Sequence, residues 1–341
     1  MCQRKCDRNC GSTTIRNLVV CLDGTSNQFG HHNTNVIELH SRILKEDQDI
    51  PQLTFYRSGI GTFVPPQRFS LRYWLSLGDN VIDQAIAWHV ESNVKEAYQW
   101  LADNYQRGDR IYLFGSLIPA IEYIGFSRGA YQIRMLSGMI EKVSFWLLGV
   151  RLLMVATEAR SSHSEIKDET EAEALAYNFK KTFSRPIKVH FVGAWDTVSS
   201  VGIVRKHSLP LAGAASCTCF FRHALALDER RVKFLPEYFS KGSTPRFGRQ
   251  PECTESTDVK EVWFAGSHSD ILNLSRVPLL WMVKEASAAG LRFTSRNMES
   301  EWEQGNLHKA IPIKSLKGSW WFLEYVHITR LSYKDENSTT R

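Results

Sequence analysis

The hydrophobic residues of this chain fall into two patterns that follow one another along most of its length. Short continuous apolar runs, rich in β-branched and aromatic residues, predict buried β-strands. These runs are RNLVVCL at 16–22, LTFYRSGIG at 53–61, RIYLFG at 110–115, AIEYIG at 120–125, IKVHFVGAW at 187–195 and EVWFAGSH at 261–268. Three of these runs end in glycine and two are followed by aspartate, and both residue types favour turns.

Between the runs, apolar residues recur at intervals of three and four, which predicts amphipathic helices. One predicted helix begins at Val36 with Asn35 as its capping residue, and another begins at His223. Three more cover about 80–105, 130–143 and 278–290. Polar stretches at 157–175 and 242–255 predict surface loops.

Strand and helix therefore alternate, which is typical of an α/β fold with a mostly parallel central sheet flanked by helices. In open sheets of this kind, ligands bind in the loops at the carboxyl ends of the strands. The chemistry of this protein is expected in those loops.

Composition narrows the class of protein. The chain has 341 residues, 43% of them hydrophobic, with 42 Lys and Arg against 36 Asp and Glu and a net charge of +6. These values exclude wholesale disorder and collagen-like or coiled-coil architecture. The basic residues of the stretch 222–237 lie among acidic ones, and we interpret this stretch as a helix surface; no nucleic-acid partner is expected.

The apolar stretches and the cysteines indicate the cellular compartment in which the protein is expected. The longest apolar stretch, 143–156, is too short to span a bilayer and contains Arg151, and the N-terminal residues lack the apolar core of a signal peptide. We therefore expect a cytoplasmic protein with no transmembrane segment. The seven cysteines show no CxxC pair with histidine partners, which favours free thiols over a metal site. The role of Cys2, Cys6 and Cys10 in the polar tail stays open.

The motif Gly125-Phe126-Ser127-Arg128-Gly129 lies between a predicted strand and a predicted helix. A nucleophile elbow needs this arrangement, because a serine on a tight turn must be flanked by residues that let strand and helix approach each other. The competing interpretation is a glycine-rich packing turn with an incidental serine.

Asp196 and His268 each follow a predicted strand directly. An aspartate there could hold a histidine tautomer, and the histidine could serve as general base. Alternatively, Asp196 closes an Asx-turn and His268 is structural. The other histidines considered were His190, His207 and His223, of which His190 lies inside a predicted strand and His223 at the start of a predicted helix. Ser127, Asp196 and His268 occur in the chain order of α/β-hydrolases.

An oxyanion hole requires two backbone N–H donors. The N–H of Arg128, next to the nucleophile, is one candidate, and the turn at Gly24 and Thr25 could supply the second. The sequence Asp23-Gly24-Thr25 also occurs in aspartyl phosphatases of the haloacid-dehalogenase type. Here Cys21 occupies the position of their nucleophile, which argues against that reading.

Together these motifs resemble the α/β-hydrolase catalytic domain of the type VI secretion phospholipase effectors, first class, which bacterial and fungal proteins share. The matching stretches are LDGTSN at 22–27, 56–61, 125–130, 193–198, HALALDERR at 223–231 and 263–270, and WWFLEY from Trp320 is similar to fungal members. The resemblance implies a triad of Ser127 as nucleophile, Asp196 as acid and His268 as base. It further implies a small-molecule or lipid ester, phospholipid in the studied effectors, as substrate, with no metal or organic cofactor.

The expected organisation is a tail at 1–15, a single α/β-hydrolase-like domain at 16–331 and a tail at 332–341. Residues 116–125 and 144–162 depart from the family pattern as insertions, and the connection after His268 is shorter than usual. The alternative function is therefore a catalytically impaired relative that acts as a lipid- or protein-binding scaffold. Trp146, Leu147, Leu148 and Leu152 could form a lid or a peripheral membrane contact, although a core helix is the favoured reading.

Overall fold

A computed structural model describes the parts of the chain that build the sheet and its flanking helices. The described residues are 15–25, 33–47, 49–59, 79–116, 129–143, 187–197, 218–230, 236, 238–239, 257–268, 276–294, 330–331 and 339–340. The predicted strand at 120–125 and the predicted loops at 157–175 and 242–255 lie outside them. So do both predicted insertions, except for Ser116.

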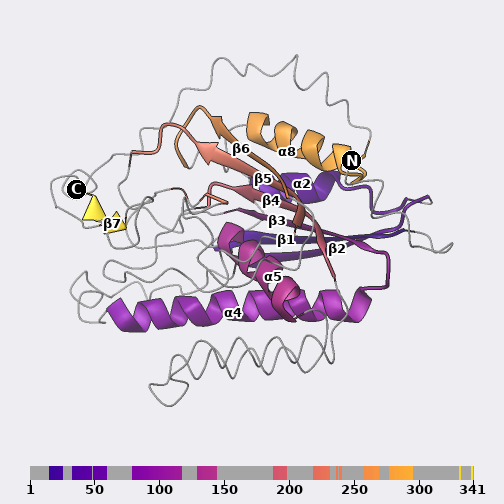
Figure 1. The fold of residues 1–341 in the computed structure, drawn as a ribbon, viewed down its shortest axis with the longest axis horizontal. Coiled ribbons are helices and arrows are strands. Elements are labelled where there is room, and N and C mark those ends of the chain that lie inside the picture. The colour runs from indigo at the N-terminus through magenta and orange to yellow at the C-terminus, as the bar shows by residue number, and fades with distance from the viewer. Residues whose placement is uncertain are drawn as a thin grey trace.

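A six-stranded parallel sheet forms the centre of the molecule (Figure 1). Its strands are β1 (Asn17–Thr25), β2 (Gln52–Gly59), β3 (Arg110–Ser116), β4 (Val189–Trp195), β5 (Thr218–Ala226) and β6 (Asp258–Phe264), in the order β2-β1-β3-β4-β5-β6. Every neighbouring pair in this sheet is parallel. The short strands β7 (Arg330–Leu331) and β8 (Thr339–Thr340) pair with each other antiparallel.

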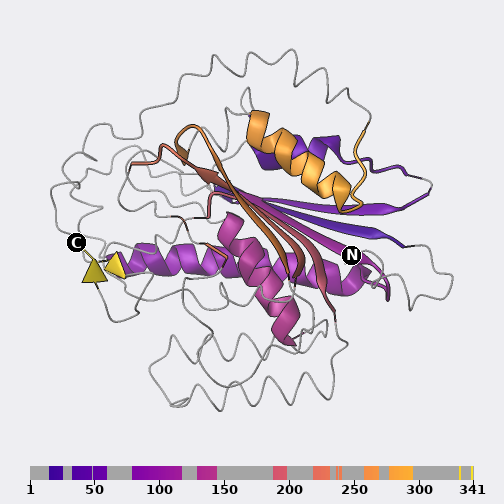
Figure 2. The same ribbon diagram turned by 45° about the horizontal axis from the view of Figure 1, so that its top comes forward.

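Helices cover both faces of the sheet, which confirms the predicted α/β fold. Helices α4 (Asp79–Asn104) and α5 (Gly129–Val143) lie on one face, and α2 (Asn35–Arg42) and α8 (Arg276–Ala288) lie on the other (Figure 2). Three predicted helices, at 80–105, 130–143 and 278–290, correspond to α4, α5 and α8. Gly290, just beyond α8, has a φ of +99°, as expected of a glycine after a helix.

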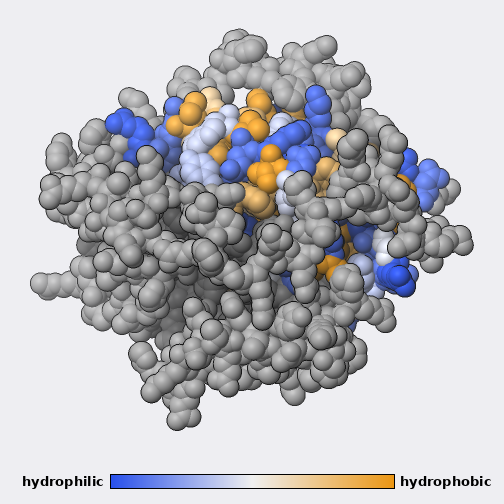
Figure 3. Space-filling model, in the orientation of Figure 1, coloured by the Kyte–Doolittle hydropathy of each residue, from blue (hydrophilic) through white to orange (hydrophobic). Residues whose placement is uncertain are grey.

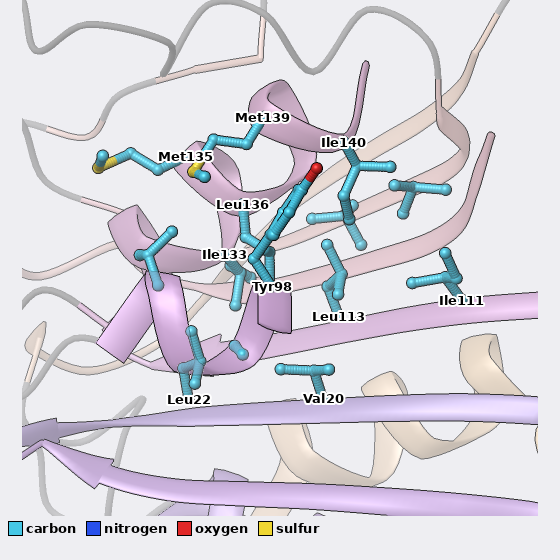
Figure 4. Packing of buried hydrophobic residues seen from close by; sticks show 14 of the residues in the cluster. Val20, Leu22, Tyr98, Ile111, Leu113, Ile133, Met135, Leu136, Met139 and Ile140 are labelled. Carbon is cyan, nitrogen blue, oxygen red and sulfur yellow. The ribbon is translucent and has the colours of Figure 1, made fainter. Parts of the chain in front are cut away.

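The alternation of side chains along β1 explains why its whole run is apolar. Leu18, Val20 and Leu22 pack with α4 and α5 in one hydrophobic cluster, part of which is drawn in Figure 4. Val19 and Cys21 point the other way, into the cluster formed with α2 and α8. A parallel strand buried on both faces needs apolar residues at every position.

The helix predicted to begin at His223 is wrong, because His223 lies inside β5. Alanine and leucine favour helix in isolation, but pairing with β4 on one side and β6 on the other outweighs that preference. Arg222, assigned above to a helix surface, is instead buried in the same strand, where it pairs with Glu285 at 2.6 Å and Asp258 at 3.1 Å.

The first predicted helix has a different cap from the one expected. Thr34, not Asn35, is the N-cap of α2, and its side-chain oxygen accepts a hydrogen bond from the Ile37 N–H at 3.2 Å. A threonine hydroxyl at this position satisfies one of the unpaired N–H groups at a helix start.

Candidate active site

The parallel strands bring their carboxyl ends to one edge of the sheet. At that edge, Ser116 at the end of β3 pairs with Trp195 at the end of β4. Trp195 pairs in turn with Ala224 of β5, and Ala226 at the end of β5 pairs with Phe264 at the end of β6. Asp196 follows β4 directly, and His268 follows β6 by four residues. The two side chains therefore start from strands that are separated only by β5.

The structure joins Asp196 and His268 by a hydrogen bond between the carboxylate Oδ2 and the ring Nδ1. Both residues are buried, with exposed fractions of 2% and 0%. The second carboxylate oxygen, Oδ1, accepts a hydrogen bond from the Ala226 N–H at 3.2 Å. A carboxylate that accepts from Nδ1–H holds the imidazole in the tautomer whose Nε2 can take a proton.

Asp196 has an unusual backbone conformation. Its φ is +44°, in the left-handed region that few residues other than glycine adopt, although aspartate tolerates it better than most. Its N–H donates to the Ala224 carbonyl at 2.7 Å, and the N–H of the next residue, Thr197, donates to Nε2 of His223 at 3.0 Å. These bonds lie on either side of Asp196, whose carboxylate contacts His268 from the other side of β5.

The turn after β5 holds the segment that carries His268. The Leu227 N–H donates to the Phe264 carbonyl at 2.9 Å, and the Gly266 N–H donates to the Asp228 carboxylate at 2.6 Å. The Glu229 carboxylate accepts from the His268 N–H at 3.2 Å. The stretch from His223 to Glu229 thus contacts the Asp196 loop on one side and the His268 loop on the other.

A second buried carboxylate, Asp23, lies at the carboxyl end of β1. Its Oδ2 accepts hydrogen bonds from the Thr34 hydroxyl at 2.7 Å and the Tyr56 hydroxyl at 3.1 Å, and its Oδ1 accepts from the Gly24 N–H at 2.7 Å. Burial, and then the Asp23 charge, raise the pKa of Tyr56. Of the predicted oxyanion donors, the Gly24 N–H is thus directed at Asp23, and Thr25 ends β1 opposite Gly59.

Ser127 and Arg128 lie outside the described residues, so only part of the predicted site is seen. Gly129, the last residue of the Gly125–Gly129 motif, begins α5. The alternative histidines lie elsewhere: His190 is inside β4, where its Nε2 contacts the Ala289 carbonyl at 2.9 Å, and His223 is inside β5. His207 is outside the described residues. Sequence reasoning missed the contact between His223 and Thr197, because it placed His223 on a helix.

Among the described residues, no group of three or more His, Cys, Asp and Glu side chains could hold a metal ion. Cys21 and Cys219 are buried cysteines, and burial raises the pKa of Cys21, which disfavours its thiolate. None of the described helices is long and apolar enough to cross a membrane. Hydrophilic and hydrophobic residues lie side by side over the end of the molecule that carries α8 (Figure 3).

A parallel α/β sheet with a buried aspartate–histidine pair at its carboxyl edge has the architecture expected of a hydrolase of the α/β class. Comparison with known protein families identifies one family model that matches most of the chain. The model of the family described as "T6SS, Phospholipase effector Tle1-like, catalytic domain" matches residues 16–285. The chain belongs to this family, which confirms the resemblance inferred from its motifs.

Two individual proteins are also similar to this chain. It is 33% identical over 257 residues to the uncharacterized protein YEL023C of Saccharomyces cerevisiae, a match that covers 72% of this chain and 36% of the yeast protein. The chain thus spans about a third of the length of that relative. A crystal structure of an uncharacterized protein from Pseudomonas aeruginosa matches with a TM-score of 0.42 and 17% identity, over 84% of this chain and 48% of that one.

Proposed function

We propose that this protein is a serine hydrolase that cleaves carboxyl esters of lipids, with Ser127 as nucleophile, His268 as general base and Asp196 as the acid. The observation that carries the proposal is the buried hydrogen bond between Asp196 and His268 at the carboxyl edge of the sheet. Membership of a phospholipase catalytic-domain family supports the hydrolase class and a lipid ester as substrate. The position of Ser127 in a Gly-x-Ser-x-Gly motif that leads into α5 supports its role.

In the proposed reaction, Nε2 of His268 takes the proton from the Ser127 hydroxyl while the serine oxygen attacks the ester carbonyl carbon. The carbonyl oxygen becomes an oxyanion, for which the N–H groups of Arg128 and Thr25 are the proposed donors, and Gly24 lets the backbone come close. His268 then gives its proton to the departing alkoxide, and the C–O bond of the ester breaks. Water, deprotonated by His268, then attacks the acyl carbon, and the bond to the Ser127 oxygen breaks as His268 returns the proton to that oxygen and the fatty acid leaves.

Asp196 would act through His268 in both steps. Its carboxylate fixes the Nδ1–H tautomer and stabilises the imidazolium that forms when Nε2 is protonated. Burial of the pair strengthens this interaction, because little water competes for the carboxylate. No step requires a metal ion or an organic cofactor.

A second candidate function, a binding scaffold without catalysis, is favoured by one observation. β3 ends at Ser116 and α5 begins at Gly129, which leaves residues 117–128 between them. A nucleophile elbow is a sharp strand-to-helix turn, so this longer connection needs an additional strand or a displaced serine. Displacement of a reacting group by about 1 Å can cost roughly a hundredfold in rate.

Hydrolysis of esters separates the two candidates. The purified chain is expected to release p-nitrophenol from acyl esters and fatty acid from phosphatidylcholine vesicles, whereas Ser127→Ala does not. Ser137→Ala, which changes a buried serine on α5 outside the proposed site, is the matched control and should keep its activity. A folded chain that hydrolyses neither substrate would favour the scaffold.

A further inference from the structure

One buried histidine has no part in the proposed reaction but lies directly against its machinery. His223, fully buried in β5, accepts a hydrogen bond at Nε2 from the Thr197 N–H, at 3.0 Å. Its Nδ1 lies 3.1 Å from a carboxylate oxygen of Glu261 on β6. Because Nε2 must offer a lone pair to the Thr197 N–H, Nδ1 carries the ring proton and donates it to Glu261.

The surroundings of His223 favour this neutral tautomer. Burial lowers the pKa of His223 below its ordinary value, although the hydrogen bond to Glu261 opposes the change. Burial opposes ionisation of Glu261, but hydrogen bonds from His223 and from the Phe239 N–H outweigh it, so the pKa of Glu261 also lies below its ordinary value. The charged groups that face His223 are Glu261 on β6, Arg134 on α5 and Asp196 after β4.

The Thr197 N–H belongs to the peptide that leaves Asp196, so its direction depends on the left-handed φ of +44° at Asp196. Strained backbone persists where surrounding bonds hold it in place. The Ala224 carbonyl accepts from the Asp196 N–H on one side of this residue, and the His223 imidazole accepts from Thr197 on the other.

We propose that His223, oriented by Glu261, is a positioning residue that fixes the backbone at Asp196 and so aims its carboxylate at His268. This role rests on the proposed function and deepens it, because it assigns His223 on β5 a part in the hydrolase site. A ring that lost the Nε2 lone pair, by protonation or by change of tautomer, would place a second donor against the Thr197 N–H and release Asp196.

Two variants of His223 each keep one of the two hydrogen bonds of the imidazole and remove the other. His223→Gln puts an amide oxygen near the position of Nε2, where it can accept from the Thr197 N–H. His223→Asn puts an amide N–H near the position of Nδ1, which keeps the Glu261 contact and leaves the Thr197 N–H without its acceptor. Both variants remove the ring, so a purely structural role predicts similar losses for both.

His190 provides the matched control. It is also a buried histidine, with an exposed fraction of 4%, and lies in the neighbouring strand β4, but it contacts the Ala289 carbonyl, away from the carboxyl edge. His190→Gln and His190→Asn should lower the melting temperature without lowering the activity of the folded protein.

The experiment measures hydrolysis of p-nitrophenyl butyrate by the full chain, with folding checked by circular dichroism. We expect His223→Gln to keep kcat within about threefold and His223→Asn to lose at least about tenfold in kcat at unchanged KM, as for a misplaced catalytic group. Equal kcat values for the two variants would overturn the proposal. If the His223 variants do not fold, Glu261→Gln, which can still accept from Nδ1–H, and Glu261→Leu, which cannot, give the same ordering.

A second readout keeps this inference separate from the proposed function. The proton between Nδ1 of His268 and Asp196 is expected far downfield in the proton NMR spectrum. It should persist in His223→Gln and vanish in His223→Asn. If the wild-type chain hydrolyses no ester, the proposed function fails. The NMR result then still decides the positioning role: a resonance that is unchanged in both variants overturns it.

Discussion

Two aspartates at the same edge of the sheet, Asp23 and Asp196, are both buried but have different partners. Asp23, at the end of β1, accepts from two hydroxyl groups and the Gly24 N–H, all of which are neutral donors. Asp196, after β4, accepts from one backbone N–H and from the imidazole of His268.

The difference separates a carboxylate that shapes a loop from one that can assist proton transfer. Hydroxyl and amide donors satisfy a buried charge, but they cannot take up a proton from a substrate at neutral pH. An imidazole can, because its pKa lies near neutrality. The contact with His268 is what places Asp196, among these two aspartates, in the proposed triad.

The largest expected effect is that of Asp196→Asn. An amide that turns its NH₂ toward His268 would favour the tautomer with the proton on Nε2, which cannot act as base. We expect ester hydrolysis to fall by about 10³- to 10⁴-fold. The measurement is kcat/KM with an acyl ester beside circular dichroism of the variant. A loss of less than tenfold would mean that Asp196 is not the acid.

Asp23→Asn tests the other carboxylate with the same chemical change. One of the two hydroxyl donors would lose its acceptor, at a cost of about 1–3 kcal/mol in the free energy of unfolding. Displacement of the Gly24 turn is expected to lower kcat by about tenfold, far less than the loss in Asp196→Asn. Urea denaturation and kinetics on the same preparation measure both effects. Reversal of the order would reverse the roles of the two aspartates.

Tyr56→Phe removes one hydroxyl from Asp23 and leaves the Thr34 hydroxyl and the Gly24 N–H in place. The expected loss is about 1 kcal/mol in the free energy of unfolding, the net value of a typical hydrogen bond. Activity should stay within about threefold of wild type, because the turn keeps two of its contacts. A denaturant midpoint that does not move would show that this hydroxyl contributes nothing to the loop.

The smallest expected effect on activity belongs to a pH dependence near Tyr56, which concerns stability alone. The His40 ring lies against the Tyr56 ring in a tilted arrangement, with centroids 5.3 Å apart. Burial, followed by the charge of Lys45, lowers the pKa of His40 to about 4. A histidine whose folded pKa is lower than its unfolded value near 6.5 stabilises the fold above that pH, and the contribution is lost as pH falls toward 4. His40→Gln should therefore flatten the decline of the melting temperature between pH 6.5 and 4.

His223 is expected to contribute in the same direction, because its pKa is also lowered. Part of the decline should then remain in His40→Gln, and a double variant with His223→Gln should remove more of it. A melting temperature that falls equally in wild type and His40→Gln would show that His40 does not titrate in this range.

The patterns that depend on neighbours along the chain could be predicted from the sequence. The continuous apolar run of β1 predicted a strand, because a strand buried on both faces is apolar at every position. The apolar spacing of three and four predicted α4 and α5, because each of these helices buries a single stripe. Asp196 and His268 could be predicted as candidate site residues from their places after strands. The contact between them, 72 residues apart in sequence, required the order β4-β5-β6.

The stretch around His223 shows where local pattern fails. Its alanines and leucines favour helix, yet β5 is the strand between β4 and β6 and takes part in both pairings. The hydrogen bond from Thr197 to His223 depends on the register that sets Ala194 opposite His223. No local propensity contains that register, so the contact between His223 and Thr197 could not be found from the sequence.

The central claim is that Ser127 is a nucleophile activated by His268 and Asp196. The most direct test is to treat the full chain with a fluorophosphonate and map the modified residue by mass spectrometry, with Asp196→Asn in parallel. We predict a single adduct on Ser127, formed much more slowly in Asp196→Asn. A folded chain that forms no adduct, or one modified at another residue, would contradict the account.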